Sequence, residues 1–304
     1  MAIVSVEKLK MSYDKGRVQA LKGVSFDVVE GEIFGLIGPD GAGKTSLFRI
    51  LTTLLLADSG TAVVDGMDVV KDYKKIRRHI GYMPGRFSLY PDLTVEENLS
   101  FFATVFNTTI EENYHLVEDI YRQIEPFKKR KAGKLSGGMK QKLALSCALI
   151  HAPHVLFLDE PTTGVDPVSR KEFWEMLQKL KKDFKLSIVV STPYMDEAMQ
   201  CDRIALIQNG QFLTIDTPEN IIRAYTQNLW SIRSDKMHRL LTDLRGINGV
   251  KTAFAFGENH HATIDTSVLT IDSLRDRLIN LGHRDVVIES VEPTIEDCFM
   301  NLQK

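Results

Sequence analysis

The sequence predicts an α/β fold that is followed by a smaller α+β domain. Two short apolar runs, 33–37 and 155–158, have the length and composition of buried parallel strands. The first run leads into a glycine-rich loop, and the second ends in two acidic residues. In α/β sheets these carboxyl ends are where ligands bind. Beyond residue 228 another series of strand and helix patterns begins, and this series predicts a second domain.

Residues 38–45 form the first chemical motif, GPDGAGKT, which fits G-x-x-x-x-G-K-[ST] at every fixed position. Apolar residues at helical spacing from Ser46 to Leu56 predict a helix directly after it. Glycines let backbone N–H groups wrap phosphates, and the helix N-terminus favours an anion. We therefore expect a bound nucleoside triphosphate, with Lys44 on its β- and γ-phosphates and Thr45 on Mg²⁺. The residues expected to contact the nucleotide here are Gly38, Pro39, Asp40, Gly41, Ala42, Gly43, Lys44, Thr45 and Ser46.

The second motif is the acidic pair Asp159 and Glu160, which follows four apolar residues. This pattern indicates a buried parallel strand whose carboxylates lie at the ligand-binding edge. In combination with the phosphate loop, we expect Asp159 to hold Mg²⁺, directly or through water. Glu160 is then the predicted catalytic residue, because it can orient or deprotonate the attacking water.

The composition is that of a globular chain of 304 residues, with 43% apolar and 26% charged residues. The net charge of −2 argues against a surface that tracks nucleic acid, so no nucleic-acid partner is expected.

No apolar run reaches the roughly 18–20 residues that cross a bilayer. The first ten residues alternate in a strand pattern, which differs from a signal peptide. Cys147, Cys201 and Cys298 form no metal or redox motif, and we expect core or surface residues of a reducing compartment.

Residues 135–141, LSGGMKQ, make the chain resemble the ATP-binding cassette (ABC) ATPase family, and its C-terminal extension resembles those of the exporter-type branch of that family. Residues 164–167, GVDP, resemble the D-loop of that family, and Tyr13 matches its adenine-stacking position. The resemblance covers about residues 1–220. It implies a mixed-sheet core, an antiparallel β subdomain and a helical subdomain, with ATP and Mg²⁺ as cofactors. The residues expected to complete the ATP site of a second cassette in trans are Ser136, Gly137, Gly138, Gln141 and Asp166.

The resemblance also implies a domain organisation and partners. The expected ATPase domain is 1–218, with a helical subdomain at about 82–148, which docks a membrane permease on the cytoplasmic face of the membrane. Sequences with the form of capping boxes start helices there, at Thr94 and at Thr109. The apolar residues Phe87, Leu89, Tyr90 and Leu93 either line a groove for the permease or belong to the core.

Two positions depart from the family pattern. The family has a Gln that contacts Mg²⁺ in a Gly-Tyr-x-Pro-Gln setting, whereas this chain has Gly85 and no Gln from 82 to 107. The family has a switch His where this chain has Pro193. A donor aimed at charge on the γ-phosphate is typically worth about 3–4 kcal/mol, and proline has no donor. We expect slow hydrolysis at this chain's own site, with Arg86 as a candidate for partial substitution.

These departures lead to a hypothesis about assembly. The chain is expected to be an ATPase subunit that powers export through a separate permease, as one half of an asymmetric cassette dimer. One alternative is a homodimeric exporter ATPase with weak turnover. Another is a largely non-hydrolytic nucleotide-binding scaffold.

The C-terminal residues predict a connector at 219–228 and an accessory domain at 229–304. The expected order is strand, helix, strand, strand, helix, strand, which suggests a ferredoxin-like module. A last helix is expected after Thr294, which begins a sequence with the form of a capping box. His260 and His261 are adjacent on a predicted strand and point to opposite faces, so we expect hairpin residues rather than a metal-chelating pair.

Overall fold

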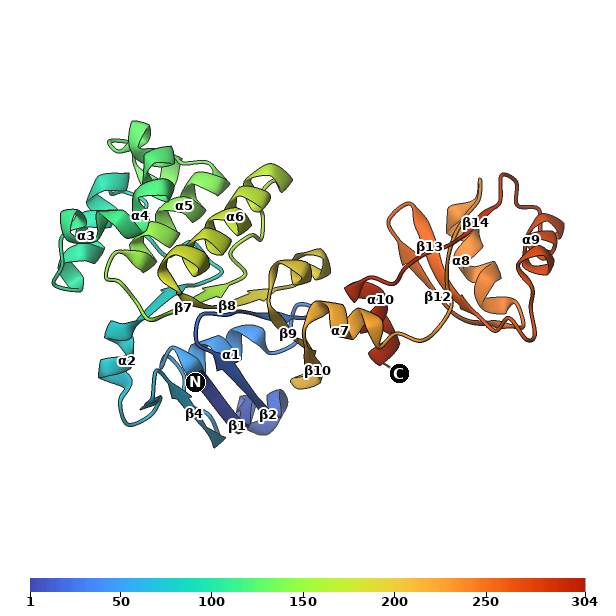
Figure 1. Cartoon of the computed structure of the whole chain (residues 1–304), viewed down its shortest axis with the longest axis horizontal. Helices are drawn as coiled ribbons and strands as arrows, with labels where there is room; N and C mark the ends of the chain where they lie inside the picture. The colour runs from blue at the N-terminus through green and yellow to red at the C-terminus, as the bar shows by residue number, and fades with distance from the viewer. Residues whose placement is uncertain (304) are drawn as a thin grey trace. The chain divides into compact units, whose positions relative to one another are not determined.

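The computed structural model describes residues 1–303, which divide into two compact units that meet between Pro218 and Glu219 (Figure 1). The strands are β1 Ala2–Tyr13, β2 Val18–Val29, β3 Ile33–Ile37, β4 Ser59–Val64, β5 Met67–Asp68, β6 Ile80–Met83, β7 Val155–Asp159, β8 Ser187–Thr192, β9 Arg203–Gln208, β10 Gln211–Asp216, β11 Leu229–Arg233, β12 Val250–Phe256, β13 Asn259–Ile264 and β14 Val287–Ser290. The α-helices are α1 Lys44–Leu51, α2 Tyr73–His79, α3 Val95–Val105, α4 Ile110–Ile124, α5 Gly137–Leu149, α6 Pro167–Phe184, α7 Pro218–Arg223, α8 Met237–Gly246, α9 Ile271–Asn280 and α10 Ile295–Leu302. Short 3₁₀ helices occur at Asp14–Gly16, Glu125–Phe127, Ala132–Lys134 and Met195–Gln200.

The larger sheet of the first unit has the strand order β10-β9-β3-β8-β7-β6. Its strands pair in parallel except at one edge, where β10 is antiparallel to β9. The sheet is therefore mixed, as predicted. Strands β3, β7 and β8 are buried over their whole length, which agrees with the apolar residues at the centre of each strand. Their carboxyl ends meet at one edge, so the loops after them can form a common site.

The smaller sheet of this unit has the order β2-β1-β4-β5 and is antiparallel throughout. A two-residue turn, Asp65-Gly66, joins β4 to β5, and its φ angles are 50° and 71°. Positive φ at both central residues is what a type I′ hairpin turn requires, and Asp-Gly is a favoured pair for it. The turn thereby fixes the backbone conformation at Asp65.

A continuous apolar cluster joins the two sheets to α1. Phe34 of β3 stacks on Phe26 of β2 with a centroid distance of 5.3 Å, and Phe48 of α1 meets Phe157 of β7 edge-on at 5.8 Å. Full burial of a side chain such as Phe contributes about 1.5–3 kcal/mol. The cluster thus holds α1 firmly against the sheet.

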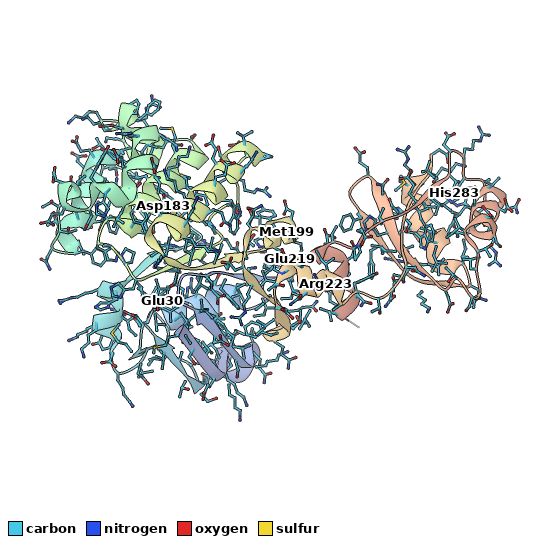
Figure 2. All side chains as sticks on the ribbon, in the orientation of Figure 1. Glu30, Asp183, Met199, Glu219, Arg223 and His283 are labelled. Atoms are coloured by element: carbon cyan, nitrogen blue, oxygen red, sulfur yellow. The ribbon has the colours of Figure 1, made fainter. Side chains whose placement is uncertain are left out.

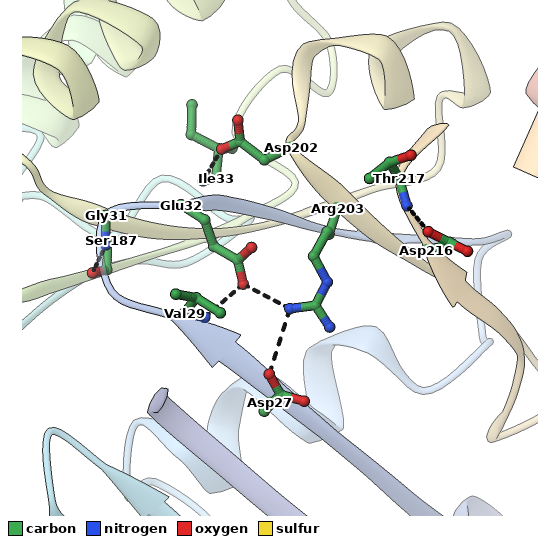
Figure 3. A network of polar contacts seen from close by, with 10 residues as sticks. All are labelled: Asp27, Val29, Gly31, Glu32, Ile33, Ser187, Asp202, Arg203, Asp216 and Thr217. Atoms are coloured by element: carbon green, nitrogen blue, oxygen red, sulfur yellow. Dashed lines mark hydrogen bonds and ion pairs between the residues drawn. The ribbon is translucent and has the colours of Figure 1, made fainter. Parts of the chain in front are cut away.

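A polar network connects the two sheets near the amino ends of β3 and β9 (Figure 3). Arg203 donates from Nη1 to Glu32 Oε1 at 3.2 Å and to Asp27 Oδ2 at 3.5 Å. Glu32 Oε1 also accepts the Val29 N–H at 2.6 Å. Burial raises the pKa of Glu32, while the Val29 hydrogen bond and the Arg203 charge oppose that rise. The network ties β2 to the start of the central strands.

The helix after the phosphate loop is shorter than predicted. Apolar spacing predicted a helix to Leu56, but α1 ends at Leu51. Thr53 has a left-handed φ of 63°, which a β-branched residue rarely adopts. Arg77 holds this conformation, because it donates from Nε to Thr53 Oγ1 and from Nη2 to the Thr53 carbonyl oxygen, each at 2.8 Å. Leu54 and Leu56 are exposed, so their spacing does not mark a buried helical face.

The helical region contains α3, α4 and α5, which appear together in green in Figure 1. Both predicted capping boxes are confirmed. Thr94 accepts the Glu97 N–H and Glu97 accepts the Thr94 N–H, and Thr109 and Glu112 make the same reciprocal pair. Local sequence thus fixes where α3 and α4 begin.

The second unit contains a four-stranded antiparallel sheet in the order β12-β13-β11-β14, with the apolar faces of α8 and α9 in its core. The predicted sequence of strands and helices is found, with α8 starting at Met237 rather than Ser234. The last helix, α10, has the predicted capping box at Thr294. It contacts α7, since Cys298 Sγ lies 3.6 Å from the Ile221 carbonyl oxygen.

The histidines of the second unit have separate partners, as expected for hairpin residues. His260 Nε2 lies 2.8 Å from the Met237 carbonyl oxygen, whereas His261 Nδ1 lies 2.8 Å from Asp297 Oδ1. His283, labelled in Figure 2, is buried between Ser234 and Asp243. Each of these histidines therefore forms its own hydrogen bonds within the second unit.

All three cysteines are free and buried, in agreement with a role in the core. Burial raises the pKa of the Cys298 thiol to about 11, with the Asp297 charge adding to the rise. Within residues 1–303, no helix combines the length and apolar character needed to cross a bilayer.

Removal of the α3 cap provides a test of the helical region. Thr94→Ala should lower the free energy of unfolding of the first unit by about 1 kcal/mol, because the Glu97 N–H loses its acceptor. Urea unfolding followed by Trp174 fluorescence, with Trp230 replaced by Phe, measures this change. Thr104→Ala is the matched control, since the Thr104 hydroxyl only donates to the Ser100 carbonyl inside the same helix. An equal loss in both variants would contradict the assignment of the cap.

Candidate functional site

The phosphate loop lies between β3 and α1, as the sequence predicted. Gly43 immediately precedes α1 and has a φ of 107°. A Cβ atom at Gly43 would lie 2.3 Å from the Ala20 carbonyl oxygen. Both the backbone conformation and the space therefore require glycine at this position.

Lys44 is buried, and its ammonium group has three protein partners. Lys44 Nζ donates to the carbonyl oxygens of Gly38 at 2.8 Å and Pro39 at 3.0 Å. It also forms an ion pair with Glu160 Oε1 at 3.1 Å. Two of these three partners belong to the loop, and the third, Glu160, follows β7. The predicted phosphate-binding and catalytic side chains are thus in direct contact.

A cavity of about 270 Å³ lies beside the loop. Its lining residues are Tyr13, Val18, Gln19, Ala20, Gly41, Gly43, Lys44, Thr45, Ser46 and Glu160. Tyr13, at the end of β1, contacts Ser46 through a hydroxyl–hydroxyl hydrogen bond of 3.1 Å. Gly38, Pro39, Asp40 and Ala42 shape the loop but do not line this cavity. The predicted adenine-stacking, phosphate-binding and catalytic residues therefore meet at one place.

The acidic pair is held by Ser191 on the neighbouring strand β8. Asp159 Oδ1 accepts the Ser191 hydroxyl at 2.6 Å. The Glu160 N–H donates to Ser191 Oγ at 3.0 Å and to the Ser191 carbonyl oxygen at 3.1 Å. Ser191 is fully buried and is the register partner of Asp159. Sequence reasoning missed this residue, although alignment of the starts of β7 and β8 would have placed the two side by side.

Gly85 follows β6 and lies next to the acidic pair. A Cβ atom at Gly85 would lie 3.0 Å from the Asp159 carbonyl oxygen and 3.7 Å from Glu160 Cβ. A side chain here would therefore reach the candidate Mg²⁺ site after a small shift of its neighbours. Three residues earlier, burial raises the pKa of Tyr82 to about 12, and the Asp159 charge adds to that rise.

Pro193 directly follows β8 and is partly buried. Both neighbours of Pro193 make side-chain contacts. The Thr192 hydroxyl donates to buried Glu197 at 2.6 Å. The Arg170 guanidinium lies 4.3 Å from the Tyr194 ring centroid. Proline adds no hydrogen-bond donor to the site from this position.

The residues expected to act in trans form a separate group. Ser136 caps α5 by accepting the Met139 N–H, and Asp166 caps α6 by accepting the Ser169 N–H at 3.0 Å. A Cβ atom on Gly138 would lie 2.8 Å from Ser169 Oγ, so the two helix starts are closely packed. Within residues 1–303, the group of Ser136, Gly137, Gly138, Gln141 and Asp166 does not line the cavity beside the phosphate loop.

An apolar cavity of about 300 Å³ lies among β6, α3 and α5. Phe87 and Leu89 line it, whereas Tyr90 and Leu93 do not. Leu89 is buried and Phe87 is 39% exposed. Phe87 and Leu89 thus agree with the prediction of a groove. Leu89 is also buried, so it agrees with the prediction of a core residue as well.

A phosphate loop and an acidic pair at the carboxyl ends of buried parallel strands define a P-loop nucleotide-binding protein. The model of the family described as ABC transporter matches residues 21–163. The Nod factor export ATP-binding protein I of Burkholderia thailandensis is 37% identical over 227 residues, which are 74% of each chain. The chain belongs to the ATP-binding proteins of the ABC transporter family.

Two further relatives differ in length. The probable multidrug ABC transporter ATP-binding protein YbhF of Escherichia coli is 42% identical over 221 residues, which are 71% of this chain and 38% of YbhF. The chain therefore spans about 38% of that relative. The linearmycin resistance ATP-binding protein LnrL of Bacillus subtilis is 29% identical over 321 aligned residues, which cover 99% of this chain and 98% of LnrL.

Solved cassettes have the same fold over the first unit. The structure of cbiO1 from Clostridium perfringens, described as part of the ABC transporter complex cbiONQ, has a TM-score of 0.66 and 28% identity and covers 73% of this chain and 91% of its own. The MJ0796 cassette, described as a post-hydrolysis dimer bound to ADP and Pi, has a TM-score of 0.64 and 26% identity and covers 70% of this chain and 98% of its own.

The role of Ser191 can be tested by replacement of each of two serines of β8 with alanine. Ser191→Ala should lower Mg²⁺-dependent ATP binding or turnover by about 10–100-fold, because the carboxylate of Asp159, which is predicted to hold Mg²⁺, loses the hydroxyl that orients it. Ser187→Ala is the control, since this equally buried serine lies at the other end of β8 and accepts the Gly31 N–H. Mg²⁺ titration of ATP affinity and of turnover measures the effect. A loss of similar size in both variants would point to general destabilisation.

Proposed function

We propose that this chain is the ATP-binding and ATP-hydrolysing subunit of an exporter, which powers transport through a separate membrane permease at the cytoplasmic face of the membrane. The observation that carries the proposal is the contact of Glu160 with Lys44 at 3.1 Å, in the lining of the cavity that Tyr13 also lines. This contact supports the role of Glu160 as a general base that acts beside Lys44 as the phosphate-binding cation. The relatives are described as proteins of Nod factor export, multidrug transport and linearmycin resistance, and these descriptions support an exporter.

Each residue of the site has a proposed role. Tyr13 stacks on adenine, the phosphate loop with Lys44 binds the phosphates, and Glu160 orients the attacking water. The Thr45 hydroxyl and the Asp159 carboxylate are oxygen donors, which suit Mg²⁺. When bound, Mg²⁺ would neutralise charge on the β- and γ-phosphates. Ser191 keeps the Asp159 carboxylate in place for this purpose.

The signature residues are proposed to act on a second cassette. Ser136, Gly137 and Gly138 stand at a helix start, where N–H groups favour an anion. Because they lie outside the chain's own cavity, their target is the γ-phosphate held by a partner, with Gln141 and Asp166 at the same interface. The dimer of the MJ0796 cassette supports this arrangement. ATP binding would join the two cassettes, and hydrolysis would let them separate.

We further propose that the pair is asymmetric. Gly85 and Pro193 leave the chain's own site without the two donors that the family places there, whereas the signature that serves the partner is intact. A homodimer with weak turnover is the alternative, and it is favoured by the retained Glu160. A non-hydrolytic scaffold is the second alternative.

The permease would dock at the apolar cavity of the helical region. Of the residues that line it, Phe87 is partly exposed and Leu89 is buried. An amphipathic helix of the permease could place apolar side chains there. The cavity touches Tyr82, Pro84 and Arg86, which flank Gly85, so docking would reach the segment beside the acidic pair.

The proposed domains are the ATPase domain at 1–218, with its helical subdomain at about 82–148, a connector at 219–228 and an accessory domain at 229–304. The strand order β14-β11-β13-β12 supports a ferredoxin-like assignment of the accessory domain, because the first and third strands of the motif lie in the centre. Helix α7 lies within the connector range apart from its first residue, Pro218.

Turnover of the purified chain distinguishes these possibilities. We expect slow Mg-ATPase activity that disappears in Glu160→Gln while ATP binding persists, because the variant keeps the phosphate loop. A candidate partner cassette should then gain turnover when this chain is added. No gain over the partner alone would contradict the asymmetric pair, and equal, negligible turnover in both forms of the chain would favour the scaffold.

Restoration of the missing donors tests the cause of slow turnover. Gly85→Gln and Pro193→His should each raise kcat, by up to about 10²–10³-fold for a well-aimed donor. Gly85→Ala and Pro193→Ala are the controls, because they change the backbone and the space without adding a donor. A rise in the Ala variants that equals the rise in the donor variants would assign the effect to the backbone.

A further inference from the structure

Two histidines and one aspartate from three separate segments of the first unit converge on one point. Asp65 Oδ2 lies 2.8 Å from His79 Nδ1 and 2.9 Å from His154 Nδ1. The three ligand atoms all lie within 4.8 Å of one another. We propose that Asp65, His79 and His154 form a binding site for a borderline transition-metal ion, with Zn²⁺ as the best fit.

The donor set selects the class of ion. Two imidazole nitrogens and one carboxylate oxygen are ligands that Zn²⁺ uses, with bonds of about 2.0–2.2 Å, whereas Mg²⁺ and Ca²⁺ prefer oxygen alone. In the structure both Nδ1 atoms face the carboxylate oxygen rather than solvent. A small rotation of the two imidazole rings away from Asp65 would increase the separation of the three ligand atoms to the separation found in a tetrahedral metal site. The three side chains would supply three ligands and leave the fourth position to water.

The backbone holds the three ligands in place without the metal. Asp65 belongs to the type I′ turn between β4 and β5, and its N–H donates to the Ile3 carbonyl oxygen at 2.7 Å. His79 ends α2, and its carbonyl oxygen accepts the His154 N–H at 2.8 Å. The two rings form a T-shaped pair with centroids 5.0 Å apart. Ordering of the ligands would therefore cost little on binding.

Charge and access are compatible with an ion. Burial acts to raise the pKa of Asp65, but the hydrogen bonds from His79 and His154 outweigh it and lower that pKa, so the carboxylate is ionised at neutral pH. The side chains of His79 and His154 are 42% and 58% exposed, which leaves a path from solvent. Arg77 and Arg78 precede His79, and the Arg77 guanidinium is directed to Thr53. The buried cysteines offer no competing site.

The position of the cluster indicates a structural ion. His79 directly precedes β6, and His154 directly precedes β7. The opposite ends of these strands lead to Gly85 and carry Asp159. A bound ion would clamp the amino ends of two parallel strands to the hairpin of the antiparallel sheet. Its expected effect is therefore on stability, and the chemistry at the far end of the strands should be unchanged.

Calorimetric titration of ZnCl₂ into the untagged, nucleotide-free chain with excess Mg²⁺ tests the site. We expect one Zn²⁺ per chain and a thermal midpoint that rises with Zn²⁺ concentration, because the ion binds the folded state. Asp65→Asn and His154→Gln should each weaken binding by at least about 10-fold and remove the rise in midpoint. His115→Gln, in an exposed histidine outside the cluster, should leave both unchanged.

A second readout uses the unaltered chain. In a long-range ¹H–¹⁵N spectrum, one equivalent of Zn²⁺ should shift the imidazole signals of His79 and His154 and spare those of the buried His260 and His283. Co²⁺ in place of Zn²⁺ should give visible absorption bands that Asp65→Asn abolishes. The proposal is overturned if the intact chain binds no Zn²⁺, if these two histidines do not shift, or if His115→Gln loses as much affinity as His154→Gln. In each of those cases Asp65, His79 and His154 only form hydrogen bonds with one another and do not bind a metal ion.

Discussion

The register of three buried parallel strands determines the geometry of the nucleotide site. Strand β8 pairs with β3 on one side and β7 on the other, so the ends of all three strands coincide. The phosphate loop, the acidic pair and Ser191 follow from that alignment. A shift by one residue would turn each side chain to the other face of the sheet. Alternate residues of these strands, Phe34 and Phe157 among them, belong to one apolar cluster on one face of the sheet, and this packing specifies the register.

The sequence predicted features whose causes are local. The phosphate loop and the three threonine caps depend on residues within a few positions of one another, and the structure has these caps as expected. The end of α1 was predicted wrongly because Arg77, far along the chain, holds Thr53 outside the helix. Ser191 and the Asp65 cluster were missed for the same reason, since tertiary folding alone brings their partners together.

Gly85 shows how absence of a side chain can matter as much as its presence. The backbone at this position approaches the Asp159 carbonyl so closely that any larger residue would contact the acidic pair. At the same time its neighbours Pro84 and Arg86 line the apolar cavity of the helical region. One short segment therefore separates the nucleotide site from the surface on which a membrane partner would act.

The ion pair of Lys44 with Glu160 has a consequence for the nucleotide site. The ammonium group contacts two carbonyl oxygens of the loop and the carboxylate of Glu160. Because the carboxylate and a phosphate are both anions, a phosphate that approached Lys44 would compete with Glu160 for the same positive charge. The conformation of the Glu160 side chain is therefore coupled, through this one contact, to whatever anion lies against the loop.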